Sequence, residues 1–198
     1  MRLFLNKLFL IFCIIFFIQS SSHAKNIEAL YKIEIAGINI GTLNWLITNN
    51  NNKYKASITL KDSGFLSGVY KFSGKYISEG DMFNELYVSN KYKQTWRTNK
   101  KERVVEIFFI KKKISELIIT PKEKELPRID YMNIDNVLDP ISSFMNILFN
   151  KNSFMTIDGR RLYKMVVKKN EKDSLVIKKI TIENYSNIWT DHNKKDLN

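Results

Sequence analysis

Apolar and polar residues alternate with a period of two along most of the chain after residue 27. In the stretch GVYKFSGKYIS, Tyr70, Phe72 and Tyr76 fall on one face while lysine and serine occupy the other. Trp96 holds the same kind of position in ELYVSNKYKQTWR. This pattern is typical of a half-buried β-strand and not of a helix.

Strands with this pattern recur between short turn segments rich in Asn, Lys and Gly. Residues 121–135, PKEKELPRIDYMNID, form the longest stretch without it, and two prolines favour an exposed connection there. The strands are predicted over residues 30–35, a return strand through Trp45 and Ile47, 53–62, 68–78, 85–97, 102–112, 114–120, 153–157, 160–169 and 174–185.

One segment has helical spacing instead. Asp139 is a good helix N-cap, and Pro140 suits the first helical position, where its missing N–H costs nothing. A helix of under three turns is marginal alone in water, so it must dock on an apolar surface. The docking stripe is predicted to consist of Ile141, Phe144, Met145 and Leu148.

Asp158-Gly159 follows this helix closely and separates two strand-like runs, which predicts a hairpin with a two-residue turn. Both residues are therefore assigned structural roles, as are Asp139 and Pro140. The predicted fold is mainly β, a strongly curved antiparallel sheet or open β-barrel with one short helix packed on it.

Residues 1–24 read as a signal peptide, with a basic start, an apolar run over 8–18, and small residues at Ser22 and Ala24. We expect cleavage after Ala24 and a periplasmic location; an uncleaved N-terminal anchor is the alternative. A single β-rich domain, 25–198, remains, and the polar turn at its end suggests that the final strands are missing.

The net charge of +12 favours anionic envelope partners, such as lipid headgroups. Compositional drift toward Lys, Asn and Ile is the alternative. The lysines are scattered, so we expect no nucleic-acid partner. Arg160 and Arg161 leave the predicted turn together and are candidate anion contacts. A surface hairpin with spare charges is the other interpretation.

Enzymatic patterns are weak. The predicted mature chain holds one histidine, His192, and no cysteine, which excludes Cys/His catalysis and zinc sites of paired His or Cys. Glu102 and Glu106 could flank a glycosidic bond but more simply line a solvated face. Asp130, Asp135 and Asp139 lie close together on a predicted loop and could in principle bind a hard cation. They lack, however, the Gly and the terminal Glu of a calcium loop. We assign no catalytic residue, no metal site and no cofactor.

Aromatic residues make up 13% of the chain and lie largely on the predicted strands. On a curved sheet they either form a core under the helix or line a groove for an apolar ligand. The candidate ligand-binding residues are Tyr70, Phe72, Tyr76, Trp96, Phe144 and Leu148.

The segments AGINIGTLNW, DSGFLSGVYKFSGKYIS, VLDPISSF and IDGRRLYKMVV occur in that order between Leu30 and about Tyr185. Through these segments and their order, the chain resembles an exported bacterial family known as "domain of unknown function 3108". The resemblance implies a secreted, mostly β protein with a helix packed on a curled sheet and a closing strand pair after Trp189. It implies no catalytic residues.

These observations favour a non-enzymatic envelope protein that binds an apolar or lipid-like ligand in a curved sheet and can contact a membrane surface. A structural module that contacts another envelope protein through a sheet edge is the first alternative. An unrecognised hydrolase is the second.

Overall fold

The computed structural model describes residues 25–35, 37–63, 67, 71–148, 153–172 and 175–189. The predicted signal peptide, Tyr70 and the region of the predicted missing strands lie outside these residues. The fold prediction is confirmed: the protein is mainly β, an antiparallel sheet that does not close into a barrel, with one short helix packed on it.

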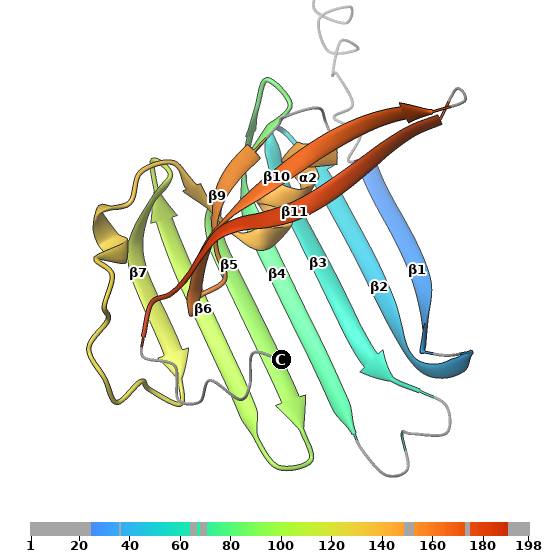
Figure 1. The fold of residues 1–198 in the computed structure, drawn as a ribbon, viewed down its shortest axis with the longest axis horizontal. Helices are drawn as coiled ribbons and strands as arrows, with labels where there is room; N and C mark the ends of the chain where they lie inside the picture. Colours follow the sequence, from blue (N-terminus) through green and yellow to red (C-terminus); the bar gives the residue numbers. More distant parts are fainter. Residues whose placement is uncertain are drawn as a thin grey trace, which may run out of the picture.

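Seven strands form the large sheet, and each pairs antiparallel with the next strand in the chain. Strand order therefore equals chain order, with β1 and β7 at the two edges (Figure 1). The strands are β1 (Lys25–Ile35), β2 (Ile38–Asn50), β3 (Lys53–Asp62), β4 (Phe72–Phe83), β5 (Leu86–Thr98), β6 (Glu102–Ile110) and β7 (Lys113–Thr120).

Three of the connecting turns consist of two residues with positive φ: 51–52, 84–85 and 111–112. Two successive residues with positive φ are the signature of the turn whose twist matches that of a hairpin. The sequence hints at the first two through Asn51 and Asn84, since asparagine tolerates this conformation. At 111–112 two lysines adopt it.

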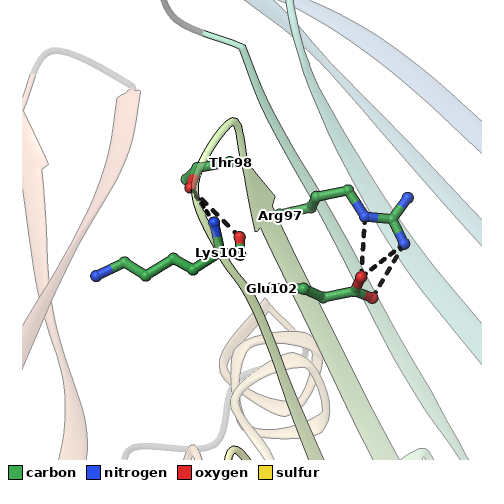
Figure 2. A network of polar contacts seen from close by, with 4 residues as sticks. All are labelled: Arg97, Thr98, Lys101 and Glu102. Carbon is green, nitrogen blue, oxygen red and sulfur yellow. Dashed lines mark hydrogen bonds and ion pairs between the residues drawn. The ribbon is translucent and has the colours of Figure 1, made fainter.

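The β5–β6 turn is held by its own side chains (Figure 2). Thr98 donates its hydroxyl to the carbonyl of Lys101 and accepts the Lys101 backbone N–H, both at 3.3 Å. Beside it, the Arg97 guanidinium forks onto the Glu102 carboxylate, with an Nε–Oε2 distance of 3.1 Å. This exposed ion pair lies on the face opposite to that of Trp96.

The two faces of the large sheet differ in chemistry. The outer face carries ion pairs such as Lys55–Glu79 and Lys93–Glu106. The inner face is mostly apolar because the strand register aligns apolar residues across the sheet. One such inner row runs through Ala29, Trp45, Ile58, Tyr76, Gln94, Val105 and Ile119.

The chain then crosses this inner face. After a connection containing a 3₁₀ turn (Tyr131–Asn133), it forms β8 (Val137–Leu138) and the helix α2 (Pro140–Leu148). Strands β9 (Ser153–Ile157), β10 (Arg161–Lys172) and β11 (Leu175–Asn187) follow. The second sheet has the order β11-β10-β9-β8, in which β8 and β9 are parallel.

The second sheet was not predicted. Strands β9 to β11 do not extend the large sheet but cross in front of it, with α2 close behind β10 and β11 in Figure 1. Alternation predicts strands but not their partners, because both sheets have the same period of two. The helix is thus covered on both sides, which explains why six of its nine residues are buried.

The face that the helix buries differs from the predicted stripe. Ile141 and Met145 are buried, whereas Leu148 is 43% exposed. Polar Ser142 and Asn146 are fully buried instead. Helical spacing identifies apolar positions, but here hydrogen bonds to the sheet make polar positions equally suitable for burial.

The β9–β10 turn lies against the large sheet. It contains Arg160 as well as Asp158 and Gly159, so it is one residue longer than predicted. Its extra residue is accommodated because the Asp158 carboxylate accepts the backbone N–H groups of Arg160 and Arg161 at 3.1 and 3.0 Å. Gly159 has φ of 102°, and a Cβ there would lie 2.3 Å from Cγ1 of Val105.

Gly159→Ala should therefore lower the free energy of unfolding by about 2–4 kcal/mol, through positive φ and overlap with Val105. Gly37→Ala is the matched control, since its φ is 79° but a Cβ would meet nothing within 4 Å. The control should lose only about 1 kcal/mol in urea unfolding. Equal losses in the two variants would contradict the close approach to Val105.

Candidate functional site

A groove of about 760 Å³ lies between the inner face of the large sheet and the elements that cross it. Leu43, Trp45, Ile58 and Tyr76 form its floor, and Tyr31 of the edge strand lies at one end. The covering elements are α2 and β10, which contribute Pro140, Ile141, Phe144, Tyr163 and Met165. Its volume falls in the range of about 300–1,000 Å³ that is typical of ligand pockets.

Phe144 joins the covering elements to the floor. Its ring lies 5.3 Å from that of Trp45, tilted by 46°. Phe144 also packs against a small core between the helix and β10 that includes Ile147, Tyr163 and Met165. The apolar lining is therefore held in place from both sides.

A second hollow of about 200 Å³ adjoins the groove. The two share Gln94, Asp158 and Arg161, so they meet at the β9–β10 turn. The smaller hollow has a different character, since Arg103 and Arg160 also line it. An apolar groove thus leads to a basic end.

The charges at this end are only partly compensated. Arg160 forms an ion pair with Glu123. The ion pair of Arg161 is longer, since its guanidinium lies 3.8 Å from the Asp158 carboxylate, and the Arg161 side chain is 54% exposed. Arg103 is exposed and makes no carboxylate contact among the described residues.

Asp158 lies at the junction of the two hollows. Burial raises the pKa of its carboxyl group, against the opposing effects of the turn N–H groups and of the two neighbouring arginines. In turn the Asp158 charge contributes, after burial itself, to the raised pKa of the Tyr76 and Tyr163 hydroxyls. The tyrosines around the junction are therefore neutral hydrogen-bonding groups.

The predicted ligand-binding residues separate into groups. Tyr76 and Phe144 line the groove, and Trp96 lines the smaller hollow. Phe72 stacks on Trp96, with the ring centroids 5.8 Å apart. Leu148, at the end of the helix, lines neither of these two hollows and points partly to solvent.

Sequence reasoning placed Trp45 only among the strand aromatics that form either a core or a groove, and it missed Ile58, Tyr163 and Met165. Trp45 and Ile58 share an inner row with Tyr76, so strand pairing in chain order would have assigned both to the groove. The β10 residues carry no such signal, because their position depends on the unpredicted crossing of the second sheet.

The start of the helix is anchored by Asp139, whose side chain is fully buried. Oδ1 of Asp139 accepts the backbone N–H groups of Ile141 at 2.8 Å and Ser142 at 3.1 Å, which are unpaired donors in any first helical turn. Asp139 is thus an N-cap, and Pro140 occupies the first helical position.

The other oxygen of Asp139 joins the helix to the sheet. It accepts the hydroxyls of Ser78, Ser89 and Ser142, the first at 2.7 Å and the last at 2.5 Å. The Tyr54 hydroxyl lies 2.5 Å from that of Ser142 and 3.0 Å from that of Ser78. Burial and the nearby Asp139 charge hold the pKa of Tyr54 well above its usual range.

Two further polar contacts continue this attachment along the helix. The Asn146 amide accepts the backbone N–H of Tyr87 and donates to its carbonyl, both at 2.8 Å, as a neighbouring strand would. On the other side, Thr156 of β9 donates to the Ser143 hydroxyl at 2.8 Å. The polar residues of the helix therefore fix its position between the two sheets.

The remaining acidic candidates occur at separate places. Glu106 pairs with lysines on the outer face, where the hydrogen bond from Lys93 is the largest cause of the lowered pKa of its carboxyl group. Asp135 pairs with Lys113. Asp130 accepts from Asn133. In the described part of the chain, no three His, Cys, Asp or Glu residues are grouped as a metal site would require.

Comparisons with protein-family models, curated proteins and solved structures gave no match. The resemblance to an uncharacterised exported family therefore stays a prediction. Within the described ranges, none of the helices has the length and apolar character needed to cross a membrane.

Asp139→Ala should lower the free energy of unfolding by about 2–4 kcal/mol, because it removes the cap and leaves buried hydroxyls without their acceptor. The control variant Asp135→Ala removes an equal charge from an exposed ion pair. It should change the free energy of unfolding by under about 0.5 kcal/mol. Urea unfolding measures both. A loss no larger for Asp139→Ala than for its control would show that the buried network does not anchor the helix.

Proposed function

We propose that this protein is an exported, non-enzymatic envelope protein that binds an apolar or lipid-like ligand in the groove beneath α2 and β10. The observation that carries the proposal is the groove itself, an open space of about 760 Å³ between two layers that otherwise pack closely. An open groove of this volume with a mainly apolar lining is the kind of site that small molecules occupy.

The lining supports an apolar ligand. Of its fourteen residues, only Asp158 and Arg161 are charged, and both lie at one end. Aromatic and aliphatic side chains cover the floor and the covering elements, as in most small-molecule sites. Removing an acyl chain from water into such a site is favourable by about 0.8 kcal/mol for each buried methylene.

Binding of N-phenylnaphthylamine, a neutral apolar fluorophore, tests the groove. The purified protein should bind it, and Ile58→Glu should weaken binding at least about tenfold by placing a charge on the floor. Fluorescence titration measures the affinity, and circular dichroism checks that each variant is folded.

Thr59→Glu is the matched control, since the same charge is added one residue further along β3 on the outer face. It should change the affinity less than about twofold. If the wild-type protein does not bind the fluorophore, and its organic extract holds no lipid by mass spectrometry, the groove does not bind an apolar ligand.

A second candidate function is attachment to another envelope protein through β1. This edge strand has no described strand on its outer side. Leu30 is 73% exposed and Tyr31 is 51% exposed. An open edge with exposed apolar residues is a ready site for pairing with a strand of another chain.

A photo-crosslinking amino acid at Leu30 should give an adduct of one defined mass in cells if β1 pairs with a partner. The same group at Ile182 of β11, which is 58% exposed, is the control. Adducts at both positions, or at neither, would argue against a specific partner at β1.

A further inference from the structure

We propose that the ligand carries a single acidic headgroup, a carboxylate or phosphate monoester, that binds between Arg103 and Arg161 while its chain extends toward Trp45. This inference rests on the proposed function and deepens it by assigning the polarity and the orientation of the ligand. It follows from how the charges are distributed along the two connected hollows.

The first argument is the asymmetry of the lining. Both charged residues of the large groove lie where it meets the smaller hollow, and the opposite end carries Tyr31, Leu43 and Trp45. A charged headgroup at that apolar end would lose its hydration without gaining a partner. An amphipathic ligand therefore has one favourable orientation.

The second argument is the charge balance of the smaller hollow. Three arginines and one aspartate line it, and Glu123 is paired with one of the arginines, Arg160. These five groups sum to one net positive charge. A carboxylate would neutralise it, and a phosphate monoester, with a charge of about −1.5 to −2 at pH 7, would slightly exceed it. Guanidinium groups bind both in bidentate geometry.

The third argument is that the two remaining arginines have no carboxylate within hydrogen-bonding distance among the described residues. Arg103 is exposed, and Arg161 contacts its aspartate only at 3.8 Å, beyond hydrogen-bonding distance. Beside them, Gln94 accepts a hydrogen bond from Tyr92 at 3.3 Å through its amide oxygen, so its amide N–H₂ group is the part left for an acceptor. All three groups are donors.

Asp158 opposes an acidic ligand at this position. Its carboxylate lies within the same hollow and repels a second negative charge. Asp158→Asn keeps the oxygen that accepts the turn N–H groups of Arg160 and Arg161 but removes the charge. The structure therefore offers a variant that should improve binding of acids without altering the turn.

Competition against bound N-phenylnaphthylamine tests the headgroup. Dodecanoate and dodecyl phosphate should displace the fluorophore at concentrations at least about tenfold lower than dodecanol, because each gains charge-assisted hydrogen bonds. Comparison of the two acids distinguishes a free fatty acid from a phosphate-bearing lipid as the preferred source of the acidic group.

Arginine variants locate that group. Arg161→Gln and Arg103→Gln should each raise the concentration of dodecanoate needed at least about tenfold and leave that of dodecanol unchanged. Asp158→Asn should lower the concentration of dodecanoate needed several-fold. Arg97→Gln is the matched control, since it removes the same charge from the outer face (Figure 2), one residue after Trp96 in β5. It should change neither value.

Tryptophan quenching tests the orientation. Trp45 and Trp96 lie on β2 and β5, three strand spacings or roughly 15 Å apart. Dodecanoate brominated at its terminal carbon should quench the fluorescence of Trp96→Phe, which retains Trp45. Dodecanoate brominated beside the carboxylate should instead quench Trp45→Phe, which retains Trp96. The third tryptophan, Trp189, is common to both variants.

The outcomes separate the two proposals. If N-phenylnaphthylamine binds but dodecanol displaces it as well as dodecanoate does, the acidic headgroup is wrong and the apolar groove stands. If bromine at the terminal carbon quenches Trp96 rather than Trp45, the orientation is wrong. If the fluorophore and all three competitors fail to bind, the proposed function itself fails.

Discussion

The architecture depends on one buried carboxylate. Asp139 receives the backbone N–H groups of its own helix through one oxygen and serine hydroxyls of β4 and β5 through the other. A buried charge is tolerated only when its hydrogen-bonding capacity is satisfied, and here both oxygens are. This contact sets the depth of α2 above the sheet, and the depth of α2 sets the height of the groove.

Polar anchoring also explains how a groove and a stable core coexist. Near the start of the helix, serines and Tyr54 bring the layers together by hydrogen bonds, and an apolar core surrounds them. Further along the inner face lies the groove, and the Trp45–Phe144 ring contact spans it. Apolar contacts are non-directional and favour burial of as much surface as possible, so a helix held by them alone would tend to close that space. The hydrogen bonds of the buried network instead fix the distance between helix and sheet.

Local features were the predictable part of this structure. Most of the strands, the helix start at Asp139 and the position of the glycine turn follow from period and turn chemistry, and Tyr76 and Phe144 were named as groove residues. The crossing of β9 to β11 was not predictable, because strand patterns do not say which sheet a strand joins. Leu148 was assigned to the site and Met165 omitted from it for that reason.

The topology predicts that the two layers form at different stages of folding. In the large sheet every strand pairs with its neighbour in the chain, so its contacts are local and form quickly. The covering layer follows it in sequence, and its anchor joins residues as far as 88 positions apart, Tyr54 and Ser142. A nascent sheet would therefore expose its aromatic face first, when a hydrophobic molecule could be enclosed as the fold closes over it.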